Sequence, residues 1–73
     1  MERSLTNTIH VLRAERKWSQ KELADRLGVS RQTIVSLEAN RYNPSLMLAF
    51  RIAEEFGKNI HEVFQYGDDQ GSD

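Results

Sequence analysis

The chain has 73 residues, of which 38% are hydrophobic and 29% charged, and this length allows one small domain with a single core. It contains no cysteine, which excludes disulfide bonds and thiolate metal sites, and its two histidines, His10 and His61, lie far apart along the chain, which gives a zinc site little support. We therefore expect no metal or other cofactor, two ordinary surface histidines, and dimerisation as the remaining means of stabilising so small a domain.

The formal net charge of the chain is −1, but the charges are unevenly distributed. Residues 1–43 hold eight basic and five acidic side chains, whereas residues 44–73 hold two and six. Because fields are screened beyond roughly 8 Å in physiological salt, a domain divided in this way can bind an anion with its basic end. The alternative is that the acidic end only keeps the protein soluble. No segment resembles a signal peptide or approaches the roughly 20 apolar residues that span a bilayer, so we expect a cytoplasmic protein without a membrane partner.

Helix signals are frequent along the chain, and strand signals are nearly absent. The first expected helix follows Thr6 or Asn7, either of which could cap it, and places Ile9 and Leu12 at the spacing of one helical face.

Two short helices are expected next, at residues 19–27 and 30–39. Ser19 opens an S-x-x-E capping box, Gly28 suits the left-handed conformation that ends a helix, and Ser30 caps the helix that follows. The residues predicted to face inward are Leu23, Ala24, Leu27, Val29, Ile34 and Leu37. Two short helices joined by a glycine-containing turn of about three residues form a helix-turn-helix.

Pro44 cannot continue a helix, so a fourth helix is expected to begin after it, at residues 45–56, with Ser45 as its cap. Its inward positions are Leu48, Ala49, Ile52, Ala53 and Phe56. A capping pair at Asn59 and Glu62 then predicts a short final helix that runs through Phe64.

The expected fold class is therefore all-α, a five-helix domain over residues 1–66 followed by a disordered acidic tail over residues 67–73. Two stretches do not fit this scheme, because SLTN at residues 4–7 and VFQY at residues 63–66 weakly alternate polar and apolar side chains. They could pair into a short terminal β-ribbon or serve across a dimer axis, while fraying termini are the default expectation.

The outward side chains of the helix at residues 30–39 cluster at its start, where Arg31, Gln32, Thr33 and Ser36 differ in hydrogen-bonding character. A B-DNA major groove about 12 Å wide admits a helix, glutamine pairs with adenine, and arginine pairs with guanine. The helix N-termini at Ser19 and Ser30 offer free backbone N–H groups to phosphates. Candidates for neutralising phosphates are Lys17, Lys21, Arg26 and Arg41. Each residue alone is most simply a solvated surface residue, but together on one helix-turn-helix they favour double-stranded DNA as the partner.

The stretch SQKELADRLGVSRQTIVSLEANRYNPSL, residues 19–46, resembles the helix-turn-helix of the phage repressor and Cro family, the Xre-like regulators. The resemblance extends from roughly Thr8 to Phe64 and implies the five-helix lambda-repressor-like fold. It implies that bases are read by Gln20, Arg31, Gln32 and Ser36, and that Thr33, Arg41 and Asn43 lie against the sugar–phosphate backbone. It also implies a partly buried ion pair between Arg13 and Glu38. Trp18 stands where the family usually has a smaller aliphatic residue, and we expect it to pack against the core.

The leading hypothesis is a sequence-specific transcription regulator, most simply a repressor, that binds a near-palindromic operator as a homodimer. The alternative is an antitoxin-like or coactivator-like module that binds a protein partner through its fourth helix and C-terminal segment. In either case the expected dimer or partner surface consists of Met47, Phe50, Phe64 and Tyr66. An enzyme is not expected, because the sequence offers no nucleophile–base constellation and too short a chain to enclose a small-molecule pocket.

Overall fold

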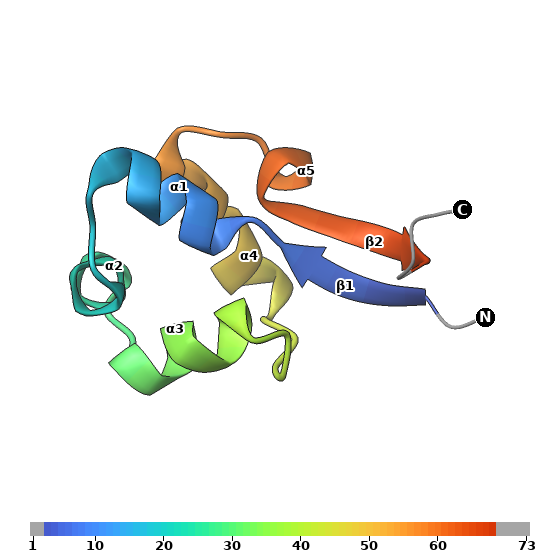
Figure 1. Ribbon diagram of the computed structural model, residues 1–73, viewed down its shortest axis with the longest axis horizontal. Coiled ribbons are helices and arrows are strands. Elements are labelled where there is room, and N and C mark those ends of the chain that lie inside the picture. The colour runs from blue at the N-terminus through green and yellow to red at the C-terminus, as the bar shows by residue number, and fades with distance from the viewer. Residues whose placement is uncertain (1–2, 69–73) are drawn as a thin grey trace.

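The computed structural model describes residues 3–68, and these form five helices and a two-stranded antiparallel sheet (Figure 1). In chain order the elements are β1 (Arg3–Asn7), α1 (Ile9–Arg16), α2 (Gln20–Leu27), α3 (Arg31–Glu38), α4 (Leu46–Phe56), α5 (Ile60–Val63) and β2 (Phe64–Asp68). The predicted all-α class with five helices is confirmed, and the two terminal stretches form the ribbon that was one of the alternatives, instead of fraying as the default expectation had it. No helix within residues 3–68 is long and apolar enough to cross a membrane.

Serine caps determine where three of the helices begin. The hydroxyls of Ser19, Ser30 and Ser45 each accept a hydrogen bond from the backbone N–H three residues further on, at 3.0–3.2 Å. Each serine thereby satisfies one of the four backbone donors that a helix N-terminus leaves unpaired. The Ser19 box is only half formed, because the carboxylate of Glu22 pairs with Arg26 instead. The box at Asn59 and Glu62 is complete, as predicted.

The start of α1 depends on Asn7. Thr8 occupies the cap position but its side chain makes no capping bond, and Asn7 Oδ1 accepts from the N–H of Ile9 at 3.1 Å instead. Of the two caps considered from the sequence, Asn7 therefore acts and Thr6 does not. The amide group of Asn7 also donates to the carbonyl of Leu37 at 2.7 Å, which ties β1 to the end of α3.

The two strands join the ends of the described chain in a ribbon that projects from the helices (Figure 1). Leu5 pairs with Tyr66 and Asn7 with Phe64, so these four residues share one face of the ribbon. The prediction that the last helix includes Phe64 is wrong, because α5 ends at Val63 and β2 begins at Phe64. The boundary of the tail is also wrong, since residues 67 and 68 belong to β2, and residues 69–73 lie outside the described residues.

The core contains the apolar residues that the sequence placed inward, except Val29, which is half-buried against it, together with Val63 and Phe64 from the C-terminal segment. Trp18 packs at its rim, stacked on Phe56 with ring centroids 5.4 Å apart, and the guanidinium of Arg26 lies 4.0 Å from the indole centroid. The guanidinium of Arg16 lies over the same indole at 5.3 Å. The predicted packing role of Trp18 is confirmed, and cation–π contacts add to the stacking.

Candidate nucleic-acid interface

The turn between α2 and α3 fixes how far α3 projects. Gly28 adopts φ +72°, and the N–H of Val29 then bonds back to the carbonyl of Ala24 at 3.0 Å. Ala24 is only 1% exposed, and its small side chain permits α3 to approach α2 closely. On α3, Ile34 and Leu37 are buried, so the opposite side of the helix is directed to solvent. The helix-turn-helix predicted from the sequence is present.

The outward side of α3 carries Arg31, Gln32, Thr33 and Ser36, and all of these except Arg31 line one hollow. Arg31 and Gln32 are exposed, while Thr33 and Ser36 are half-buried. The hollow, of about 330 Å³, is lined by Ser30, Gln32, Thr33, Ser36, Arg41 and Tyr42. Gln32 Nε2 lies 3.5 Å from Ser36 Oγ, a long hydrogen bond that a base edge can displace. This surface carries both donors and acceptors, which base recognition in the major groove requires.

Tyr42 is the residue of this hollow that the sequence did not single out. It is 44% exposed and follows Arg41 directly in the loop between α3 and α4. The only signal available in the sequence was its place in the stretch NRYNP beside a basic residue. A phenol there supplies a flat apolar ring with a hydroxyl donor at its tip.

Gln20 connects the recognition surface to the interior of the domain. Its Nε2 donates to Glu38 Oε1 at 3.1 Å, and its Oε1 accepts from Arg31 Nη1 at 3.5 Å. Because a carboxylate can only accept, Glu38 requires the amide nitrogen of Gln20 to point toward it. The oxygen of Gln20 is then directed to Arg31. Gln20, which the resemblance implies to be a base-reading residue, therefore lies beside the recognition helix.

Arg13 and Glu38 form the partly buried ion pair implied by the family resemblance. Arg13 Nε and Nη2 donate to Glu38 Oε2 and Oε1 at 2.6 and 3.0 Å, and Nη1 donates to the carbonyl of Trp18 at 2.9 Å. Hydrogen bonding to Glu38 raises the pKa of Arg13, burial opposes this, and the attraction of the opposite charge reinforces it. The pair joins α1 to the last residue of α3 and so fixes the orientation of the recognition helix.

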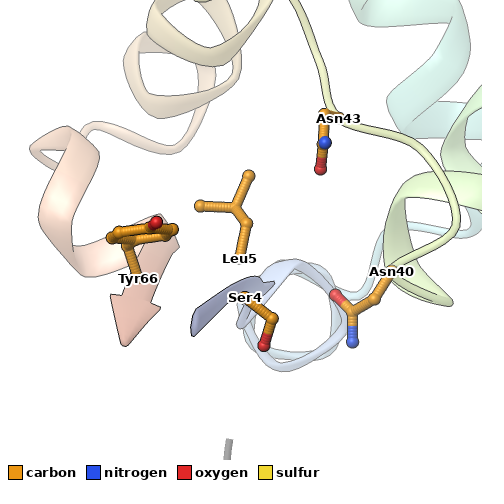
Figure 2. A pocket seen from close by; sticks show the side chains of 5 residues that line it. All are labelled: Ser4, Leu5, Asn40, Asn43 and Tyr66. Atoms are coloured by element: carbon orange, nitrogen blue, oxygen red, sulfur yellow. The ribbon is translucent and has the colours of Figure 1, made fainter. Parts of the chain in front are cut away.

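The predicted phosphate-binding residues are not equivalent in the structure. Arg41 is exposed beside Tyr42 and forms no ion pair within residues 3–68. Lys21 is paired with Asp25 at 3.0 Å, but both side chains are highly exposed and the pair can open at little cost. Asn43 does not line the hollow on α3. Asn43 and Asn40, from the loop after α3, line a different hollow, in which they face Leu5 and Tyr66 of the ribbon (Figure 2).

The predicted dimer or partner surface is present only in part. Met47, Phe50 and Tyr66 are 73%, 53% and 66% exposed, whereas Phe64 is 8% exposed. The prediction for Phe64 is wrong, because Phe64 directly follows α5 at the end of the ribbon nearest the helices, where its ring packs in the core. His10 and His61 are both exposed, and no cluster of three His, Asp or Glu side chains able to hold a metal occurs among residues 3–68.

This geometry defines a small helix-turn-helix domain with a recognition helix, and comparison with known proteins agrees. Residues 9–63 match the family model described as helix-turn-helix. The chain is 47% identical over 66 residues to a transcriptional regulator of helix-turn-helix type from Methanocaldococcus jannaschii, covering 90% of this chain and all of that protein. The chain therefore belongs to the helix-turn-helix transcriptional regulators, a family of DNA-binding proteins with Xre-like and Cro-like members.

More distant relatives indicate the range of this family. The immunity repressor protein of Bacillus phage phi105 is 34% identical over 55 residues, which is 75% of this chain and 38% of that protein. Antitoxin HipB of Escherichia coli strain K12 is 34% identical over 50 residues, which is 68% of this chain and 57% of that protein. Among solved structures, a candidate DNA-binding protein from Bacteroides fragilis superposes with a TM-score of 0.75 at 28% identity, covering 84% of this chain and 98% of that one.

Proposed function

We propose that the protein is a repressor that acts in the cytoplasm and binds a near-palindromic operator as a homodimer, with one α3 in each of two successive major grooves. The observation that carries this proposal is the outward side of α3, where Arg31 and Gln32 are exposed and neither is held by an ion pair within the described chain. The similarity to a phage immunity repressor supports repression, as opposed to activation, of transcription. Occupancy of the operator would exclude polymerase without any further domain.

The residue roles follow from the atoms that each side chain leaves available. Gln32 can pair with adenine and Arg31 with guanine, while Ser36 and the oxygen of Gln20 supplement them. The amide nitrogen of Gln20 donates to Glu38, so only its oxygen is available to bases. We propose that this oxygen accepts a hydrogen bond from a base and also supports Arg31. The proposed phosphate-binding residues are Ser19, Lys21, Ser30, Thr33 and Arg41, and Asn43 is not among them because it faces the ribbon and not the hollow on α3. The hydroxyls of Ser19 and Ser30 serve as helix caps. At these two positions we therefore propose that the backbone N–H groups of the helix N-terminus, and not the hydroxyls, contact the phosphate.

A selection of bound sequences from a random DNA pool tests the proposal. It should return two half-sites related by a two-fold axis and about 10 base pairs apart, centre to centre. On the selected site, Gln32→Ala should cost roughly 1–3 kcal/mol of binding free energy and relax the preference at one position, with little effect on random DNA. Glu15→Gln, at an exposed position of α1, is the control and should bind as the wild type does. Equal loss on selected and random DNA would refute the role of Gln32 in reading bases.

The exposed apolar side chains of α4 favour a second candidate function, a module that binds another protein. Met47 and Phe50 are more than half exposed, and the similarity over 50 residues to a protein named as an antitoxin lends this candidate some support. If Gln32→Ala left all binding unchanged while Phe50→Asp abolished a protein contact, this second function would be correct.

A further inference from the structure

Three hollows of the surface meet at a single side chain, that of Leu5. One, of about 410 Å³, separates the ribbon from the loop that carries Asn40 and Asn43. Figure 2 shows Leu5 standing between Tyr66 on one side and Asn40 and Asn43 on the other. The second, of about 470 Å³, lies along Phe64 and Tyr66, and the third, of about 270 Å³, lies between the ribbon and the start of α4. We call the residues that line the three hollows, together with Met47 and Phe50 beside Leu46 on α4, the Leu5 face.

The Leu5 face has no strongly charged side chain. Its third hollow is lined only by apolar residues, Leu5, Pro44, Leu46, Ala49, Ile60 and Phe64. The other two add serine, asparagine, glutamine, histidine and tyrosine, but no Lys, Arg, Asp or Glu. In a chain that is 29% charged, such a surface is distinctive, because depletion of charge marks the centre of protein–protein interfaces. A surface without cations is also unsuited to DNA.

Exposed apolar side chains of α4 and the ribbon lie next to these hollows. Leu46 is 70% exposed, Phe50 follows it one helical turn later, and Tyr66 stands on the ribbon at 66%. Together with Met47 these side chains expose about 500 Å² of surface per molecule, given that a whole aromatic side chain offers about 150–250 Å². Two such surfaces in contact would bury about 1,000 Å², which reaches the size expected of a specific interface.

We propose that the Leu5 face is the surface through which two copies of this chain pair, and this inference rests on the proposed homodimer. Across a two-fold axis each group approaches its own equivalent, so a charged face would repel its copy whereas an uncharged face does not. The face also leaves the outward side of α3 free. The molecule is 36 Å long, with the ribbon at one end of that axis and α2 at the other (Figure 1). An axis near the ribbon therefore leaves enough length for two α3 helices to lie about 34 Å apart on DNA.

Light scattering and sedimentation equilibrium of the full chain test this inference with the variant Leu46→Glu. Leu46 is the first residue of α4, where a carboxylate interacts favourably with the helix dipole, so the fold should be retained. The variant should raise the dimer dissociation constant at least about 100-fold, because two carboxylates would be brought into one apolar interface. Phe50→Glu should act in the same direction. The control is Val11→Glu, which introduces the same charge at an exposed apolar position of α1. Circular dichroism and Trp18 fluorescence establish that each variant is folded.

The possible results separate this inference from the proposed function. Loss of the dimer in both α4 variants, with the control unchanged, supports the Leu5 face. If both α4 variants form dimers as readily as the wild type, the Leu5 face is not the dimer interface, whether the face is vacant or binds a different protein. The proposed homodimer on an operator would then have to use another surface. A wild type that stays monomeric at high concentration and binds each half-site independently overturns the face and the homodimer together, while Gln32→Ala still tests the reading of bases.

Discussion

Removal of the Glu38 carboxylate should be among the most destabilising single changes on the helix-turn-helix. In Glu38→Ala, two donors of Arg13 and the amide nitrogen of Gln20 lose their acceptor. Breaking a fully buried pair costs about 3–5 kcal/mol. The side chains of Arg13 and Glu38 keep 18% and 11% exposure, so water replaces part of the loss and we expect about 2–4 kcal/mol.

This cost is large for so short a chain. At about 0.05–0.15 kcal/mol per residue, a domain of 73 residues has only about 4–11 kcal/mol of stability. The midpoint of thermal unfolding should therefore fall by roughly 10–30 °C, because 1 kcal/mol corresponds to about 4–8 °C in a domain of this size. Trp18, the single tryptophan, lies at the rim of the core on Phe56 and reports the transition by its fluorescence.

Asp25→Ala is the matched control, since it also breaks an ion pair on the helix-turn-helix but at a highly exposed site. It should change the stability by no more than about 1 kcal/mol. A cycle of Arg13→Met, Glu38→Ala and the double variant should give a coupling of about 2 kcal/mol or more. If Glu38→Ala were no more destabilising than Asp25→Ala, the pair of Arg13 and Glu38 would not be what anchors α3 to α1.

Two further changes test the loop and the turn. Arg41→Ala should weaken binding almost equally on all DNA sequences and lower the slope of log affinity against log salt by about 1. The control Lys58→Ala, at an exposed position after α4, should leave that slope unchanged. An unaltered slope in Arg41→Ala would show that Arg41 does not contact a phosphate. Gly28→Ala should lower the free energy of unfolding in urea by about 1–2 kcal/mol, because a residue with a Cβ is strained in the left-handed conformation. No atom lies within 4 Å of the position that the Cβ would take, so a much larger loss would indicate a clash that the structure does not contain.

The helices could be predicted from the sequence because their signals are local. A serine cap acts on an N–H only three residues away, and a glycine at the end of a helix needs nothing beyond its own backbone, so Ser19, Ser30, Ser45 and Gly28 acted as predicted. The apolar spacing also identified the buried side of each long helix. The helix-turn-helix, which consists almost entirely of such signals, was therefore predictable within one stretch.

The ribbon and the environment of Gln20 depend on contacts between distant residues. Leu5 and Tyr66 are some sixty positions apart, and their pairing exists only after the helices have brought both ends together. The burial of Phe64 follows from its position at the end of the ribbon that packs against the helices, and it has no separate local signal. The orientation of the Gln20 amide likewise depends on Glu38, a residue of another helix, whose carboxylate accepts from its nitrogen. The resemblance implied that Gln20 reads bases, but the sequence could not say which of its atoms faces outward.

The net charge of −1 does not oppose DNA binding, because the structure separates the acidic side chains from the unpaired basic ones. On the helix-turn-helix, Glu22, Asp25 and Glu38 each form an ion pair with a basic residue of α1 or α2, so their charges are largely compensated where they stand. Arg31 and Arg41 form no ion pair within the described residues, and both are exposed on α3 or directly after it. The short helix α5 lies on the opposite side of the molecule from α3 (Figure 1). Glu55, from the acidic half of the chain, is itself paired with Arg26 of α2 at 3.4 Å. A phosphate at α3 therefore meets two guanidinium groups that no carboxylate of the described residues pairs with.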